Sequence, residues 1–308
     1  MGLAKGKTFK NPVGMAAGFD KNAEAYNGLL KVGCFGFVEV GTITPKAQSG
    51  NPTPRMFRLI EDEAVINRLG FNNEGKDRAL SRLQTARHGI VGVNIGKNKD
   101  TVEAIEDYLI GLKTFYPVAD YITVNISSPN TEGLRALQQR DTLRMLVTTL
   151  KTEQKNLQGK HQRKVPMLVK IAPDLTDAEM EQILDVAQEC NVEGLILTNT
   201  TTARSDALKS KHKGETGGLS GQPLKARSLE VMKKAYKQTG GRMPLIGVGG
   251  VGSAQDAIER MQAGASLVQL YTAMVYRGPH LITEILKGIQ CHLDQRGLAS
   301  VNDLVGMD

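Results

Sequence analysis

The chain has 308 residues, 40% of them hydrophobic and 5% aromatic, and its 39 Lys and Arg against 32 Asp and Glu give a net charge of +7. This length allows a large core without requiring a second domain, because barrels of alternating strands and helices often exceed ~200 residues. The charge suits an anionic ligand, an anionic membrane face or nucleic acid, but the basic residues form no compact basic or aromatic motif, which argues against nucleic acid.

Short apolar runs rich in β-branched residues alternate with stretches of helical period, the pattern of an α/β protein with parallel strands. We expect strands at residues 13–17, 35–40, 90–94, 121–125, 167–171, 194–198, 245–248 and 267–270. We expect helices at residues 101–115, 142–157, 176–190, 225–238, 254–263 and 281–295. Eight such strands predict a (β/α)8 TIM barrel with its active site at their carboxyl ends. A doubly wound sheet is the alternative, but residues 17–21 lack its G-x-G-x-x-G.

Three further segments complete the predicted architecture of one domain over residues 1–308. Thr176 and Glu179 have the spacing of a capping box, which marks a helix start. Residues 52–60 and 64–69 predict two short strands, a β insertion that forms a wall over the C-terminal face of the barrel strands. Residues 203–218 are rich in Lys, Ser and Gly without a period, which predicts a mobile lid.

Amides, hydroxyls and lysines recur where the predicted strands end. The residues at these exits are Lys21, Thr42, Asn94, Asn125, Asn130, Lys170, Thr198, Asn199 and Thr200. Side-chain amides match the alternating N–H and carbonyl groups of a planar heterocycle, so this rim suits a pyrimidine or a flavin. A single Asn at a strand end is more often a cap or a turn. Asp20 beside Lys21 predicts a local ion pair that orients the lysine.

The loop after the fourth predicted strand contains two Asn, two Ser and a Thr around a proline. Pro129 biases Ser128 toward an extended conformation, in which the hydroxyl points outward. We therefore single out Ser128 as the reactive residue, although an ordinary turn of Ser and Asn would have the same composition.

Residues 247–250 read Gly-Val-Gly-Gly after the seventh strand, and Tyr271 and Thr272 follow the eighth. Backbone N–H groups at this corner of a barrel commonly bind a phosphate. A simple glycine turn is the alternative.

Cysteines and histidines offer no competing chemistry. Cys34, Cys190 and Cys291 lack CxxC or Cys/His spacing, so we expect no disulfide framework and no metal site. The five histidines follow no strand beside a nucleophile, which argues against a Ser-His-Asp triad. No apolar run reaches the ~18 residues that cross a bilayer and no secretory signal is present, so we expect the chain as given to be soluble.

Several blocks together resemble the class 2, quinone-linked dihydroorotate dehydrogenases of pyrimidine biosynthesis. The blocks are residues 7–12, 16–21, 67–72, 94–98, 125–130, 170–174, 198–201, 217–221 and 247–250. Class 1 members have a cysteine base where this chain has Ser128, which favours class 2.

The resemblance implies that dihydroorotate is oxidised to orotate, that a tightly held FMN takes the hydride and that a membrane quinone reoxidises it. It implies that Ser128 is the base. Because a serine hydroxyl is a poor base unaided, Ser128 needs a proton path, for which Thr131 is the nearest candidate. Substrate contacts fall to Lys21, Asn67, Arg68, Leu69, Gly70, Phe71, Asn125, Asn130, Asn199 and Thr200. FMN contacts fall to Ala16, Ala17, Gly18, Thr42, Asn94, Asn125, Lys170, Thr198, Gly221, Gly249, Gly250, Tyr271 and Thr272.

Class 2 members carry an N-terminal helical segment that meets an anionic membrane and forms the quinone entrance. They lie peripherally on the inner membrane, on its cytoplasmic face in bacteria, or on the mitochondrial inner membrane. Here the barrel pattern begins near Asn11, so we expect that segment to be absent and quinone reduction to be impaired. Three alternatives stay open: an FMN barrel with another small substrate, a redox-inactive phosphate-binding lyase or isomerase, and a basic binding module.

Overall fold

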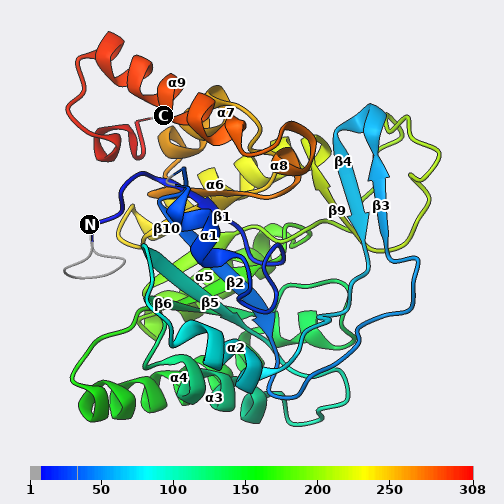
Figure 1. The fold of residues 1–308 in the computed structure, drawn as a ribbon, viewed down its shortest axis with the longest axis vertical. Coiled ribbons are helices and arrows are strands. Elements are labelled where there is room, and N and C mark those ends of the chain that lie inside the picture. The colour runs from blue at the N-terminus through cyan, green and yellow to red at the C-terminus, as the bar shows by residue number, and fades with distance from the viewer. Residues whose placement is uncertain (1–7, 33, 308) are drawn as a thin grey trace.

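The computed structural model describes residues 8–32 and 34–307, and a closed barrel of eight parallel strands lies at its centre (Figure 1). The barrel strands are β1 (Val13–Met15), β2 (Phe37–Ile43), β5 (Ile90–Ile95), β6 (Tyr121–Asn125), β7 (Met167–Ile171), β8 (Gly194–Leu197), β10 (Leu245–Val248) and β11 (Leu267–Leu270). Their order around the barrel is β1–β11–β10–β8–β7–β6–β5–β2. The predicted TIM barrel is confirmed, and each predicted strand overlaps an observed one.

Helices form the outer layer of the barrel. They are α1 (Tyr26–Lys31), α2 (Lys76–Leu83), α3 (Ala104–Phe115), α4 (Arg140–His161), α5 (Asp177–Glu189), α6 (Lys225–Thr239), α7 (Ala254–Gln262), α8 (Thr272–Arg277) and α9 (His280–Arg296). Consecutive helices from α2 to α7 contact one another, and α9 packs on α7. The capping box of Thr176 and Glu179 starts α5 as predicted. The short helices α1, α2 and α8 were not predicted.

Large side chains fill the interior of the barrel near the amino ends of its strands. The Phe37 ring occupies the space beside Gly14, where a Cβ would lie 2.4 Å from it. Tyr121 meets Phe37 edge to face at 6.3 Å between ring centroids, and Phe9 contacts Phe37 at 5.4 Å. Leu168 and Ile246 complete this cluster, as is usual for barrels whose interior is a packed core. Space for a ligand is therefore left at the carboxyl ends of the strands.

A second, antiparallel sheet stands to one side of the barrel, at the right in Figure 1. The predicted insertion forms the hairpin of β3 (Met56–Leu59) and β4 (Ala64–Asn67) around the 3-10 turn η1 (Ile60–Asp62). A third strand, β9 (Gly218–Gly221), pairs with β4 and was not predicted. The wall over the barrel thus comes from two segments that are far apart in the sequence.

Residues 203–217 lie against this sheet. Leu208 is 5% exposed and packs with Leu59, Ile66 and Leu219. The Asp62 carboxylate accepts hydrogen bonds from the backbone N–H groups of residues 209 and 210, at 2.9 and 3.0 Å. The predicted lid is therefore anchored to the insertion, and its mobility stays a prediction.

The described residues also form the 3-10 turns η2 (Leu134–Gln138) and η3 (Gln222–Leu224), and η4 (Val301–Leu304) follows α9. Among the described residues, no helix has the length and apolar character needed to cross a bilayer. The expectation about a segment ahead of the barrel concerns residues 1–7, which lie outside the described residues.

Candidate active site

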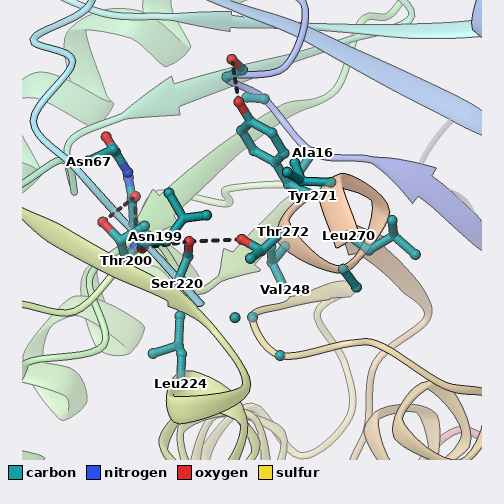
Figure 2. Close-up of a pocket in the computed structure, with 18 of the residues that line it drawn as sticks. Ala16, Asn67, Asn199, Thr200, Ser220, Leu224, Val248, Leu270, Tyr271 and Thr272 are labelled. Carbon is teal, nitrogen blue, oxygen red and sulfur yellow. Dashed lines mark hydrogen bonds between the residues drawn. The ribbon is translucent and has the colours of Figure 1, made fainter. Parts of the chain in front are cut away.

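A cavity lies at the carboxyl ends of the barrel strands, beneath the insertion sheet (Figure 2). Most predicted site residues line it: Ala16, Ala17, Gly18, Lys21, Thr42, Asn67, Leu69, Gly70, Phe71, Asn125, Ser128, Asn130, Lys170, Thr198, Asn199, Thr200, Gly221, Gly249, Gly250, Tyr271 and Thr272. Residues from the carboxyl ends of seven barrel strands and from the insertion therefore line one cavity.

Three predicted site residues do not line the cavity. Arg68 turns outward, donates to the Glu215 carboxylate at 2.7 Å and lies over the Phe57 ring at 4.6 Å. Asn94 is fully buried behind the lining. Thr131 is 7% exposed, and its Oγ1 has no hydrogen-bond partner among the described residues. The geometry assigns Arg68 to holding residues 203–217 rather than to facing a ligand.

A buried carboxylate inside the barrel orients the amides behind the cavity. Glu39 is fully buried, and it accepts hydrogen bonds from Tyr121 Oη at 3.0 Å, Gln269 Nε2 at 2.9 Å and Asn94 Nδ2 at 2.8 Å. Burial, together with the nearby Glu39 charge, raises the pKa of Tyr121 well above its ordinary value, so the phenol stays a donor. Because a carboxylate only accepts, the Asn94 amide must point its NH2 group at Glu39.

The orientation of Asn94 is passed on to the cavity surface through two more amides. Asn94 Oδ1 accepts from Thr42 Oγ1 at 2.6 Å and from Asn125 Nδ2 at 3.2 Å. Asn125 Oδ1 in turn accepts from Ser127 Oγ at 3.0 Å and from Asn199 Nδ2 at 3.4 Å. The chain of bonds fixes which atoms of these amides remain available to a ligand.

The candidate base lies next to this amide chain. Ser128 is 6% exposed, and its Oγ accepts a 3.3 Å hydrogen bond from the Asn130 N–H. The Asn130 side chain donates to Asn67 Oδ1 across the cavity at 3.1 Å. The Ser128 hydroxyl makes no other hydrogen bond with the described residues, so its proton and one lone pair remain available.

The predicted ion pair between Asp20 and Lys21 is absent. The Asp20 carboxylate instead accepts from the backbone N–H groups of Glu24, Ala25 and Tyr26, at 2.8, 2.9 and 2.6 Å. These donors lie where α1 begins, and they would otherwise lack partners. The prediction was wrong because the carboxylate stabilises the backbone rather than its neighbour.

Two lysines at the cavity carry unpartnered ammonium groups. Neither Lys21 nor Lys170 has a hydrogen bond or an ion pair with the described residues, and Lys170 is only 5% exposed. Burial, with a smaller repulsion from Arg55, lowers the pKa of Lys21 to about 8. Burial also lowers the pKa of Lys170, against an opposing attraction to Glu39. A buried cation without a partner is costly, so both positions favour an anionic ligand.

The opposite end of the cavity is made of glycine turns. Gly249 and Gly250 have φ angles of 112° and 70°, in the left-handed region that favours glycine. A Cβ at Gly250 would lie 2.6 Å from the Lys225 backbone. Nearby, Thr272 Oγ1 at the start of α8 donates to Ser220 Oγ at 2.8 Å (Figure 2). This end offers backbone N–H groups and hydroxyls, as a phosphate requires.

Part of the lining is formed by residues that the sequence did not indicate. The missed residues are Met56, Arg58, Glu63, Val65, Ser220, Gln222, Leu224, Val248, Val251, Gly252, Leu270, Ala273, Val275, Tyr276 and Arg277. Leu219 packs in the apolar cluster of the insertion sheet, so recognising β9 would have placed Ser220 on the opposite face, toward the cavity. Most of the others lie on the insertion or within α8, and not directly at the end of a predicted barrel strand.

Comparison with known proteins identifies the family of this barrel. The sequence profile described as Dihydroorotate dehydrogenase matches residues 3–293. The chain belongs to the dihydroorotate dehydrogenase family. The dihydroorotate dehydrogenase (quinone) of Agrobacterium fabrum is 52% identical over 300 residues, which cover 97% of this chain and 82% of that protein. The enzyme of the same name from Brucella anthropi is 52% identical, covering 98% and 84%.

Solved structures of the family agree with this assignment. The ligand-free dihydroorotate dehydrogenase of Eimeria tenella matches with a TM-score of 0.94 at 49% identity, covering 99% of this chain and 90% of that chain. Its complex with ferulenol matches with a TM-score of 0.94 at 48% identity, covering 99% and 87%. The predicted class 2 membership, the oxidoreductase activity and the oxidation of dihydroorotate in pyrimidine biosynthesis are confirmed. Family membership also implies a flavin cofactor.

Proposed function

We propose that the flavin is FMN and that the cavity binds it together with dihydroorotate. The observation that carries this proposal is the pair of unpartnered ammonium groups, Lys21 and Lys170, in one cavity with glycine turns at its far end. One resident anion and one anionic substrate would neutralise both. The residues that would hold FMN are Ala16, Ala17, Gly18, Thr42, Asn125, Lys170, Thr198, Gly221, Gly249, Gly250, Tyr271 and Thr272.

Lys170 and the glycine turns fit such a cofactor in different ways. The buried Lys170 side chain is held in one position, and its ammonium group would stabilise negative charge on the flavin ring. Cβ atoms at Gly249 and Gly250 would contact Ser228 and Lys225 of α6, so the turns need glycine. The backbone of these turns lines the cavity, where its N–H groups would bind a phosphate. Asn94 contributes from behind by holding Thr42 and Asn125.

The amide end of the cavity would bind the substrate. Lys21 would bind the substrate carboxylate. A charge-assisted hydrogen bond between its ammonium group and that carboxylate would be strong. Asn67, Asn125, Asn130, Asn199 and Thr200 would bind the ring amides and carbonyls, with Leu69, Gly70 and Phe71 beside them. The buried Glu39 fixes the donor and acceptor directions of Asn94 and, through it, of Asn125.

Ser128 would act as the base that takes the ring proton. A bound flavin would supply the acceptor for the hydride of the neighbouring ring carbon. A serine hydroxyl is a poor base unless its site excludes water and a second group carries the proton away. Burial of Ser128 meets the first need, and the unpartnered buried hydroxyl of Thr131 is a candidate for the second. Closure of residues 203–217 over the site would complete the exclusion of water.

We further propose that a quinone reoxidises the flavin, as the name of the relatives implies for them. The cavity continues past Tyr271 toward apolar side chains of the insertion and α8, including Met56, Val65 and Val275. An apolar path of this kind suits a lipid-soluble acceptor, which would place the enzyme peripherally at an anionic membrane surface. Sedimentation with anionic and with neutral vesicles would test that location.

The proposal is tested by the colour and redox response of the purified protein. We expect a yellow protein whose extracted flavin has the mass of FMN and whose absorbance is bleached anaerobically by dihydroorotate. Dihydrouracil, which lacks the carboxylate, should bleach it far more slowly because it cannot pair with Lys21. Extraction of FAD would refute the cofactor, and equal bleaching by dihydrouracil would refute the role of Lys21.

A further inference from the structure

Next to the cavity, a partly exposed ion pair joins two segments that the proposed chemistry does not use. Arg135 Nη1 lies 2.8 Å from Asp174 Oδ2, and the side chains are 26% and 20% exposed. Arg135 lies on η2, after the loop of Ser128, and Asp174 lies just after β7. Neither residue lines the cavity, so neither is available to touch a ligand there.

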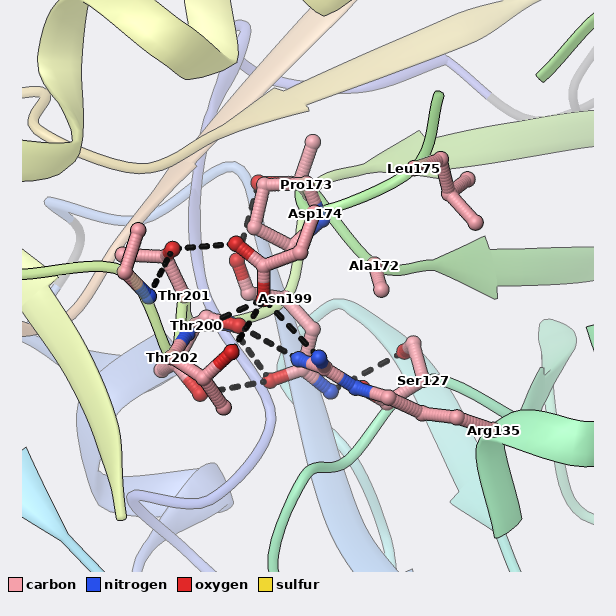
Figure 3. A network of polar contacts seen from close by, with 12 residues as sticks. Ser127, Arg135, Ala172, Pro173, Asp174, Leu175, Asn199, Thr200, Thr201 and Thr202 are labelled. Carbon is pink, nitrogen blue, oxygen red and sulfur yellow. Dashed lines mark hydrogen bonds and ion pairs between the residues drawn. The ribbon is translucent and has the colours of Figure 1, made fainter. Parts of the chain in front are cut away.

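The other donors of Arg135 reach two carbonyl oxygens at the active site (Figure 3). Nε donates to the Ser127 carbonyl at 3.1 Å, and Nη2 donates to the Thr200 carbonyl at 3.1 Å. The Ser127 carbonyl belongs to the peptide that connects directly to Ser128. Since the guanidinium is planar and rigid, it fixes the two carbonyls and the Asp174 carboxylate relative to one another.

Asp174 extends the same network to the segment after β8. Its carboxylate accepts hydrogen bonds from the Thr201 hydroxyl and, at 2.9 and 3.2 Å, from the backbone N–H and the hydroxyl of Thr202. Burial opposes its ionisation, but hydrogen bonds from Thr201, Thr202 and Arg135 outweigh burial and hold the pKa of Asp174 below its ordinary value. The charged pair therefore ties the exits of β6, β7 and β8 together at neutral pH.

Few other contacts fix Ser128. Its side chain makes one hydrogen bond, from the Asn130 N–H at 3.3 Å, and Pro129 restricts the chain only on its C-terminal side. On the N-terminal side, the Ser127 N–H and hydroxyl both donate to Asn125 Oδ1, which holds Ser127 itself. The bond from Arg135 fixes the Ser127 carbonyl, which belongs to the 127–128 peptide plane.

We propose that Arg135, held by Asp174, is a positioning residue that aims the Ser128 hydroxyl at the substrate. The proposal rests on the proposed role of Ser128 as base. Rotation of the 127–128 peptide would move the hydroxyl away from the ring carbon without removing any ligand contact. Arg135 thus affects the proton-transfer step, while flavin binding depends on other residues.

Anaerobic stopped-flow measurement of flavin reduction at saturating dihydroorotate tests this role in Arg135→Gln. A misplacement of about 1 Å can slow a reaction by roughly 10²-fold, so we expect a reduction rate lower by about 10- to 100-fold. Flavin content should be unchanged and orotate affinity should change by only a few-fold. Arg135→Lys should recover little of the rate, because a single ammonium cannot reach three acceptors.

A matched control is Arg144→Gln, which removes an arginine of α4 that pairs with Glu189 at the surface. It should leave the reduction rate unchanged. If Arg135→Gln lost flavin or stability but reduced flavin at the normal rate, Arg135 would be merely structural and the proposal would fail.

The double variant separates this proposal from the assignment of the base. In a Ser128→Ala background, Arg135→Gln should slow flavin reduction by less than about threefold, since the group that it positions is gone. An equal slowing in both backgrounds would overturn the positioning role. If Ser128→Ala alone reduced flavin at the normal rate, the assignment of Ser128 as the base would fail. The two single variants therefore distinguish a failure of that assignment from a failure of the positioning role of Arg135.

Discussion

The two ends of the cavity are built for recognition by different means. At the amide end, Asn125 and Asn199 present side chains whose directions are set by a hydrogen-bonded chain that begins at the buried Glu39, and Lys21 adds an ammonium group outside that chain. At the glycine end, Gly249 and Gly250 present backbone, and side chains are excluded by steric contact. Substitutions at the amide end should therefore change reaction rates and substrate affinity while flavin stays bound. Substitutions at the glycine end should instead decide whether flavin is bound at all.

The largest expected effect is that of Ser128→Ala at the amide end, which should change the reaction rate without changing flavin binding. We expect flavin reduction to slow by about 10²–10⁴-fold, the usual contribution of a general base, with flavin content and orotate binding preserved. Anaerobic flavin reduction and a spectral titration with orotate measure the two quantities. Near-normal reduction would remove Ser128 as the base.

At the glycine end, Gly250→Ala should give protein that loses most of its flavin. The new Cβ would lie 2.6 Å from Lys225 Cα, so the turn must move. Gly297→Ala is the matched control, because Gly297 has a similar φ of 65° but no atom within 4 Å of a Cβ. Both variants should lose about 1 kcal/mol of stability from backbone strain. Equal flavin content in the two would contradict the assignment of the phosphate end.

The charge at the amide end predicts a pH dependence of orotate binding. Burial lowers the pKa of Lys21 to about 8, so its ammonium is charged below that pH and becomes neutral above it. Orotate affinity should then fall as pH rises above about 8, with a slope that approaches roughly tenfold per pH unit. Lys21→Met should bind orotate weakly at all pH values and abolish the slope. A slope that persists in this variant would assign it to another group.

The smallest expected effect is that of Ser220→Ala. It removes the hydrogen bond from Thr272 at the glycine end, and one neutral hydrogen bond contributes about 1 kcal/mol. Flavin affinity, measured by fluorescence on dilution, should fall only a few-fold. A complete loss of flavin would show that hydroxyl groups, rather than the glycine backbone, dominate this end.

The sequence predicted the barrel well because its strands are buried on both faces and read as apolar, β-branched runs. It did not predict β9, since Gly218–Gly221 has two glycines and its partner strand β4 lies in a distant insertion. The helices α1 and α8 have six residues each, which is too short for a visible period.

For the site, the sequence predicted which residues gather but not all of their directions. Strand exits place backbone reliably, which is why Asn125, Lys170 and Thr272 meet in one cavity. Arg68 lies among lining residues yet points to Glu215, and Asp20 bonds to backbone N–H groups rather than to its neighbour. Such choices depend on partners brought together by folding, so sequence proximity does not determine them.

The pairing of β4 with β9 has a consequence for exchanging loops between members of the family. Ala64 pairs with Gly221 and Asn67 with Gly218, so segments about 150 positions apart form one unit. A chimera that receives only a foreign hairpin would set a new β4 against the old β9 and lose the packing of Leu208. Grafts should therefore transfer both segments together, because the hairpin and β9 form one structural unit beside the active-site cavity.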